Sequence, residues 1–101
     1  MKQGSIAMQF LVVARDGTDD GAPARRVAAR EAHIEGAKAM AQTGAMILGG
    51  ALLDDHGAMI GSTCIVDFAD RAALDAWLNA DPYVTGDVWR TIEVTPFRRA
   101  V

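Results

Sequence analysis

Residues 46–68 read MILGGALLDDHGAMIGSTCIVDF, two apolar runs separated by a short polar turn. The runs 46–53 and 59–68 consist largely of apolar residues, several of them β-branched, as is typical of strands. Residues 54–57, Asp-Asp-His-Gly, belong to the types that favour turns. Because so short a connection joins antiparallel neighbours, this stretch predicts a β-hairpin in the middle of the chain.

A helix is expected on each side of this hairpin. Residues 23–43 are rich in alanine and other good helix formers, and Gly44 stands where a left-handed residue commonly ends a helix. After the hairpin, Asp70 can cap a helix over residues 71–79. The apolar face of that second helix would consist of Ala73, Leu74, Trp77 and Leu78.

Two further strands are expected at the ends of the pattern. Residues 8–14 are apolar and precede a turn-forming segment, and residues 88–97 form the last strand-like run. The order strand, helix, strand, strand, helix, strand predicts an α+β fold of the ferredoxin-like type, with a four-stranded antiparallel sheet and two helices on one face. A single domain over residues 8–99 fits the length of the chain, and residues 1–7 are expected to be a flexible leader.

The predicted sheet lacks a polar face. In the run 59–68, one face would carry Ile60, Cys64 and Val66, and the other would carry Met59 and Ile65. A sheet that is apolar on both sides needs a second covering layer, and the chain has no element left to supply it. A homodimer is the simplest source of that layer, and a higher oligomer would supply it too.

Composition excludes several classes of function. The formal net charge is −3 and the ten Lys and Arg residues are mostly dispersed, so a nucleic-acid partner is not expected. No uncharged stretch, residues 43–53 included, reaches the about 20 residues that span a membrane, and no export signal is recognisable. The sequence therefore predicts a cytoplasmic protein. Cys64 is the one cysteine, which excludes an intrachain disulfide, and we expect it to be buried in a strand.

The first helix contains the first candidates for chemistry. At 100° per residue, Arg30 falls within an apolar arc and His33 lies at the edge of that arc. His33 can serve as a general acid or base and Arg30 as an anion clamp, or Arg30 can extend outward while His33 makes a structural contact. The rest of the arc comprises Val27, Ile34, Ala37 and Ala41. The opposite, solvent-exposed side comprises Glu31, Glu35, Lys38 and Gln42.

Other candidates each have a structural alternative. Asp81 before Pro82 can be a functional carboxylate or an ordinary helix cap. Ser62 can donate a hydrogen bond into a pocket, but its surroundings do not form a nucleophile elbow. His56 lies in a turn with two aspartates, and a solvated loop is a better interpretation of that turn than a metal site. Neither a metal nor an organic cofactor is expected.

Several short motifs, taken in order, resemble the YciI-like (YCII-related) family, over residues 8–97. They are Arg30-Glu31-Ala32-His33-Ile34, Gly49-Gly50-Ala51-Leu52, Gly61-Ser62-Thr63, Asp81-Pro82-Tyr83 and Pro96-Phe97. The resemblance implies a subunit of the dimeric α+β barrel superfamily. It also implies that His33 and Asp81 face a pocket, with Ser62 and Tyr83 as neighbours.

The candidates and the resemblance together predict a cofactor-free enzyme that carries out an elimination or an isomerisation on a small cyclic or aromatic compound. His33 would be the base, Asp81 would orient its ring, and Arg30 would bind an anionic group. The resemblance extends to a dehydrochlorinase of chlorinated hydroxyhydroquinones and, more distantly, to muconolactone isomerase and cofactor-free monooxygenases. The alternative is a non-catalytic protein that binds a small ligand in the same pocket.

Overall fold

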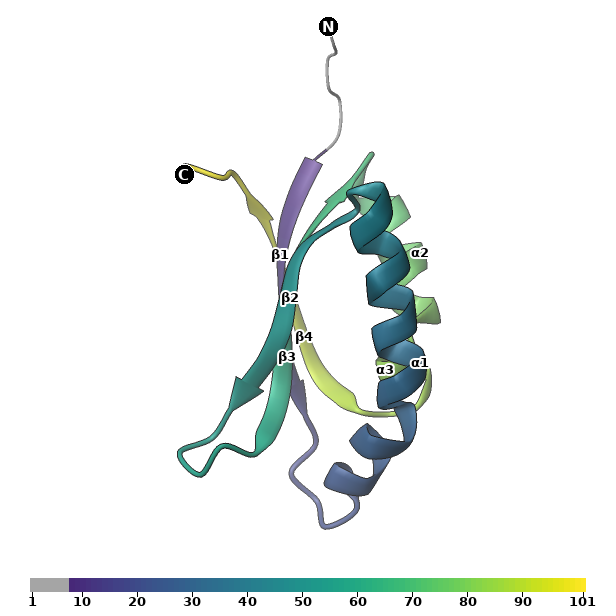
Figure 1. The fold of residues 1–101 in the computed structure, drawn as a ribbon, viewed down its shortest axis with the longest axis vertical. Coiled ribbons are helices and arrows are strands. Elements are labelled where there is room, and N and C mark those ends of the chain that lie inside the picture. Colours follow the sequence, from purple (N-terminus) through teal and green to yellow (C-terminus); the bar gives the residue numbers. More distant parts are fainter. Residues whose placement is uncertain (1–7) are drawn as a thin grey trace, which may run out of the picture.

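A computed structural model describes residues 8–101, and the predicted leader, residues 1–7, lies outside the described residues. The predicted β-α-β-β-α-β order is confirmed. The four strands form one antiparallel sheet in the order β2-β3-β1-β4, and the helices cover one of its faces (Figure 1). The elements are β1 (Met8–Asp16), α1 (Ala22–Thr43), β2 (Met46–Leu53), β3 (Met59–Phe68), α2 (Arg71–Ala80), α3 (Pro82–Thr85) and β4 (Trp89–Phe97).

The short helix α3 is the one element that the sequence pattern did not predict. Four residues are too few to show a helical period, and the Asp81-Pro82 pair indicated only that a helix or turn begins there. In the structure, the carboxylate of Asp81 accepts a hydrogen bond from the backbone N–H of Tyr83 at 3.0 Å. This contact caps α3 and fixes the chain between α2 and β4.

The core lies between the sheet and the helices. The register places Val12 of β1 beside Cys64 of β3 and Val94 of β4, so these side chains share the face that the helices cover. Two leucines of α2 meet this face, and the segment around α3 adds three more buried side chains. These residues are Leu74, Leu78, Tyr83, Val88 and Trp89.

The predicted apolar face of α1 is confirmed only in part, since Ile34 and Ala37 are half-buried. Val27 is 75% exposed and Ala41 is exposed as well, whereas Ala22 and Arg26 are buried. The side of α1 that faces the core is shifted by about one residue position from the predicted arc. On the shifted side, Arg26 forms an ion pair with Asp16 of β1 inside the protein. A buried charge with a partner is tolerated where an unpaired one is not. The residues of α1 that pack against the core are Ala29, Ala37 and Met40.

The face of the sheet away from the helices is partly apolar. Leu11 and Val13 of β1 and Ile65 of β3 are half-buried, and Leu48 of β2 is 52% exposed. The register places Ile65 beside both Leu11 and Leu48, so these side chains form one patch across three strands. We call Leu11, Val13, Leu48 and Ile65 the outer-face patch.

The hairpin turn uses its aspartate to hold the backbone. Asp54 Oδ1 accepts hydrogen bonds from the N–H groups of His56 at 2.8 Å and Ala58 at 3.0 Å. Within residues 8–101, no group of three or more His, Cys, Asp or Glu side chains is arranged to hold a metal ion. No helix in the same range has the length and apolar character needed to cross a membrane.

Gly61 of β3 lies against the backbone of β1, and we predict that Gly61→Ala destabilises the protein. A methyl group there would overlap the carbonyl oxygen of Ala14 and would come within 3.1 Å of Leu52 Cδ1. The backbone cannot move aside without disturbing the β1–β3 pairing, so the free energy of unfolding should fall by about 1–3 kcal/mol. Urea unfolding measures this change.

Gly36→Ala is the matched control, because a methyl group at Gly36 on α1 meets nothing within 4 Å. Alanine is a better helix former than glycine, so this variant should gain about 0.5–1 kcal/mol of stability. Equal effects of the two substitutions would contradict the close packing inferred at Gly61.

Cys64 is 6% exposed, and burial raises the pKa of its thiol to about 12. At pH 8 such a thiol is ionised in about one molecule in ten thousand, whereas an unperturbed cysteine is ionised in about one in four. We predict that iodoacetamide labels the native protein slowly at pH 8 and labels the urea-unfolded protein rapidly, as measured by mass spectrometry. Rapid labelling of the native protein would show that the thiol is accessible and ionised.

Candidate functional site

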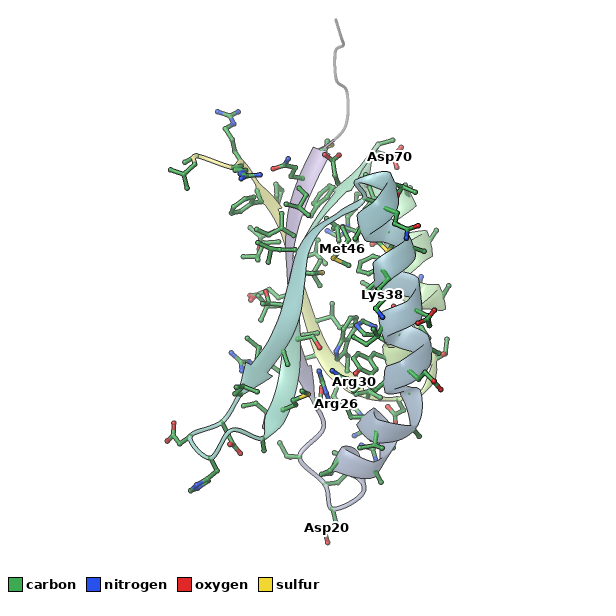
Figure 2. The ribbon with its side chains drawn as sticks, in the orientation of Figure 1. Asp20, Arg26, Arg30, Lys38, Met46 and Asp70 are labelled. Carbon is green, nitrogen blue, oxygen red and sulfur yellow. The ribbon has the colours of Figure 1, made fainter. Side chains whose placement is uncertain are left out.

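A cavity of about 430 Å³ lies between α1 and the strands β2 and β3. Most of its wall is apolar, and both tryptophans, Trp77 and Trp89, contribute to it. Figure 2 shows that side chains of α1 extend toward the sheet along this gap. The lining side chains with polar or ionisable groups that bear on its chemistry are Arg26, Arg30, His33, Lys38, Ser62 and Tyr83.

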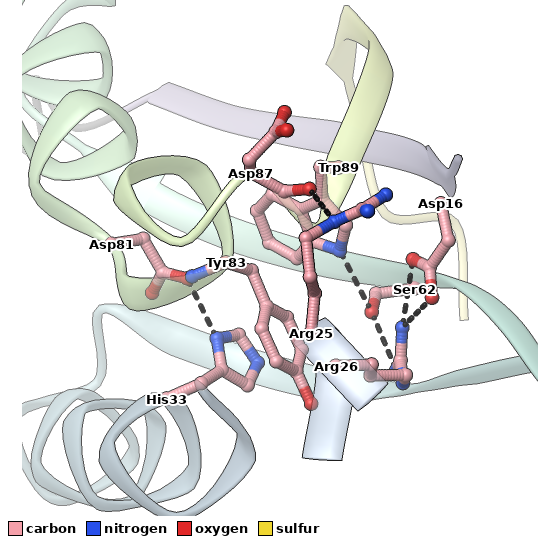
Figure 3. A network of polar contacts seen from close by, with 9 residues as sticks. All are labelled: Asp16, Arg25, Arg26, His33, Ser62, Asp81, Tyr83, Asp87 and Trp89. Carbon is pink, nitrogen blue, oxygen red and sulfur yellow. Dashed lines mark hydrogen bonds and ion pairs between the residues drawn. The ribbon is translucent and has the colours of Figure 1, made fainter. Parts of the chain in front are cut away.

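His33 and Asp81 form a hydrogen-bonded pair, although 48 positions separate them in the sequence. His33 Nδ1 lies 2.8 Å from Asp81 Oδ2, and the side chain of Asp81 is only 5% exposed (Figure 3). An ionised carboxylate accepts hydrogen bonds only, so Nδ1 carries a proton and the neutral ring has its lone pair on Nε2. Within the described residues Nε2 has no hydrogen-bond partner.

The two members of the pair occupy different positions relative to the cavity. His33 lines the cavity, whereas Asp81 is not among the lining residues and stands behind the imidazole, at the start of α3. The resemblance implied that both residues face a pocket, and the structure meets that expectation for His33. Asp81 is therefore placed to orient the ring and has no access to a ligand of its own.

Aromatic contacts hold the plane of the imidazole. The ring of Tyr83 stacks on His33 with the centroids 3.9 Å apart and the planes 13° from parallel. Trp89 meets the same imidazole edge to face at 5.5 Å. The guanidinium carbon of Arg26 lies 4.7 Å from the centre of the Tyr83 ring, and Figure 3 shows this ring between Arg26 and His33. With one edge hydrogen-bonded and one face covered, the imidazole has little freedom to rotate.

A second polar network adjoins the cavity and includes three residues that sequence reasoning missed. Arg26 Nη1 donates to both carboxylate oxygens of Asp16, at 2.9 and 3.0 Å, and Arg26 Nη2 donates to Ser62 Oγ at 3.0 Å. Trp89 Nε1 also donates to Ser62 Oγ, at 3.1 Å. The missed residues are Asp16, Arg26 and Trp89. Asp16 and Arg26 lie on either side of the turn between β1 and α1, and their opposite charges were a signal for an ion pair. Nothing in the sequence indicated that this ion pair is buried.

This network fixes the direction in which Ser62 can hydrogen-bond. A hydroxyl oxygen has two acceptor sites and one proton. Arg26 and Trp89 occupy both acceptor sites, so the remaining role of Ser62 is to donate its proton. Burial raises the pKa of Tyr83, so that hydroxyl also keeps its proton at neutral pH. The cavity that His33 lines is thus also lined by two residues with hydroxyl donors, Ser62 and Tyr83.

The structure brings four of the five predicted site residues to one cavity, namely Arg30, His33, Ser62 and Tyr83, with Asp81 directly behind. Arg30 is exposed and lies at the rim. Lys38 lines the same rim, although the helical arc assigned it to the solvent-exposed side. On the helix surface Lys38 neighbours Ile34 and Ala41, which also line the cavity, so the cavity wall extends beyond the predicted arc on that side.

Comparison with known proteins identifies a matching family and a similar protein. Residues 8–98 match the YCII-related domain family. Protein YciI of Escherichia coli O6:H1 is 31% identical over 98 residues, which cover 91% of this chain and 98% of that protein.

Two solved structures share the fold. One is 5-chloro-2-hydroxyhydroquinone dehydrochlorinase from Burkholderia phenoliruptrix in complex with 2,5-dihydroxybenzoquinone, with a TM-score of 0.79 and 19% identity over 92% of this chain and 96% of that one. The other is a dimeric ferredoxin-like protein of unknown function from Bacteroides fragilis, with a TM-score of 0.56 and 9% identity over 94% and 98% of the two chains. The match over residues 8–98 and the similarity to YciI over nearly its whole length lead to one conclusion: the chain belongs to the YCII-related domain family.

Proposed function

We propose that this protein is an enzyme that transfers a proton on a small cyclic or aromatic compound, in an elimination or an isomerisation. The observation that carries the proposal is the His33–Asp81 pair, in which a buried carboxylate holds Nδ1 and leaves Nε2 free on an imidazole that lines the cavity. A neutral histidine with an unpaired Nε2 can accept a proton and so act as a general base.

The surroundings of His33 suit the charge that forms during such a step. When Nε2 takes a proton from the substrate, the imidazole becomes positively charged. The carboxylate of Asp81, 2.8 Å from Nδ1, stabilises that charge, and so does the face of the Tyr83 ring. The base therefore needs no rearrangement of its neighbours as the proton moves.

The two hydroxyl donors suit the negative charge that develops on the substrate when it loses a proton. Removal of a proton from a carbon next to a carbonyl or phenol group moves an electron pair toward the oxygen. We expect the hydroxyls of Ser62 and Tyr83, which line the same cavity as His33, to stabilise negative charge on that oxygen. Arg26 and Trp89 hold Ser62 Oγ in place, so this donor is oriented before the substrate arrives.

The shared fold supports the choice of compound class. The Burkholderia dehydrochlorinase was solved with 2,5-dihydroxybenzoquinone, an oxygen-bearing ring. A ring of this size suits a mostly apolar cavity of about 430 Å³. At 19% identity this relative shows only the fold, so the proposal depends on the residues of this chain.

A non-catalytic binding protein is the second candidate. The His33–Asp81 contact joins α1 to α3, and Asp81 also caps α3, so the same pair has a structural role whatever else it does. A binding protein would use the cavity and its hydroxyl donors without needing Nε2 as a base. The two candidates differ in whether a ligand proton exchanges with solvent.

We also propose that the protein is a homodimer assembled through the outer-face patch. The patch has no covering layer from residues 8–101, and two copies packed sheet to sheet would bury it. The Bacteroides fragilis protein, which has the same fold and is dimeric, supports a dimeric state.

We predict that His33→Ala abolishes proton transfer but leaves the fold intact. The readout is deuterium incorporation from heavy water into a panel of hydroxylated aromatic compounds and cyclic ketones, followed by NMR. Loss of a general base should slow exchange by roughly 10²–10⁴-fold. Asp81→Asn should also slow exchange, because an amide does not stabilise the imidazolium as a carboxylate does.

Asp70→Asn is the matched control for the aspartate. Asp70 caps α2 by accepting a hydrogen bond from Ala73 N at 2.8 Å, and it does not line the cavity. Exchange rates should stay unchanged in this variant. If the wild-type protein accelerates exchange in no compound of the panel, or if His33→Ala exchanges as fast as wild type, the enzymatic proposal is wrong.

The dimer predicts a solution mass of twice the 10.7 kDa of one chain by light scattering at micromolar concentration. Leu48→Glu places a charge within the outer-face patch and should shift the mass toward that of one chain. Val27→Glu makes the same change at an exposed position of α1 and should leave the mass unaltered. A wild-type mass of 10.7 kDa would rule out the assembly.

A further inference from the structure

Every charged residue that lines the cavity is cationic. Arg26, Arg30 and Lys38 all lie along α1 and contribute to its wall, and no aspartate or glutamate does. The chain as a whole has a formal net charge of −3, so this concentration of positive charge runs against its overall composition. Figure 2 shows these three side chains along the part of α1 that faces β2.

The three cations are not equivalent. Arg26 is buried and donates to both oxygens of Asp16, so its charge is already compensated within the protein. Arg30 and Lys38 are exposed at the rim, and within residues 8–101 neither forms an ion pair. The uncompensated positive charge of the cavity therefore resides at its mouth.

Both rim cations lie close to the base along the helix. Arg30 precedes His33 by three residues and Lys38 follows it by five, which correspond to about 4.5 Å and about 7.5 Å along the axis. Both side chains line the same cavity as the imidazole. An anion held between them would place the rest of a small ligand against the apolar wall, within reach of His33 and Ser62.

We propose that the natural ligand is a ring compound with an anionic substituent, such as a carboxylate, and that Arg30 and Lys38 bind this substituent at the cavity mouth. The inference rests on the proposed function for the identity of the site and adds the charge of the substrate. The rim cations select the ligand and set its orientation, whereas the hydroxyls of Ser62 and Tyr83 bind an uncharged or developing oxyanion deeper in the cavity. Lys38 is thus a specificity residue that the sequence did not reveal.

The experiment compares two probes that differ by one carboxylate, 2,5-dihydroxybenzoate and hydroquinone. Both tryptophans line the cavity, so quenching of intrinsic fluorescence reports binding. The benzoate should bind more tightly, and its affinity should fall as salt is added. Lys38→Gln and Arg30→Gln should each weaken benzoate binding by roughly two- to fivefold and leave hydroquinone binding unchanged.

Arg71→Gln is the matched control. It removes the same charge from an exposed arginine of α2 that pairs with Asp75 and does not line the cavity, so benzoate affinity should not change. Equal affinities for the two probes, equal effects of all three variants, or no binding by any member of a series of hydroxybenzoates at millimolar concentration would each overturn the inference.

The same experiment separates this inference from the proposed function. His33→Ala removes the base but neither rim cation, so this variant should still prefer the benzoate. If the preference holds while His33→Ala leaves proton exchange unaltered, the anion site stands and the enzymatic proposal fails. If exchange depends on His33 while the probes bind equally, the enzymatic proposal stands and the anion site fails.

Discussion

The buried ion pair between Arg26 and Asp16 sets the geometry on which the site depends. Its two side chains are only 7% and 6% exposed, and removing one partner would leave an uncompensated charge inside the protein. The pair ties α1 to β1 and fixes which side of the helix faces the sheet. With α1 in that orientation, His33, two turns further along, points into the cavity and meets Asp81.

The pair also organises polar groups around it. The same guanidinium donates to Ser62 and lies over the ring of Tyr83, which in turn stacks on His33. One buried cation thus connects residues of β1, β3 and α3 to the helix that carries the base. Because each contact restricts the next, the donors and the base hold their relative positions without a bound ligand.

The sequence predicted the fold well and the site in part. Alternating strand-like and helical runs around the hairpin gave the element order, because such patterns depend on neighbours along the chain. Short motifs led to His33, Ser62, Asp81 and Tyr83. The orientation of α1 could not be predicted, because an arginine counts as polar in any hydrophobic pattern and its burial depends on an aspartate across a turn. Trp89 and Lys38 were missed because their contribution to the cavity depends on how distant segments pack.

Asp81 serves the architecture and the chemistry with one oxygen atom. Its Oδ2 accepts from both the backbone of Tyr83 and the ring of His33, so the helix cap and the orientation of the base share a single acceptor. A replacement of Asp81 therefore removes the cap of α3 and the partner of the imidazole at the same time. Diversification of the cavity is therefore easier at the rim, where the side chains of α1 can change without loss of the base.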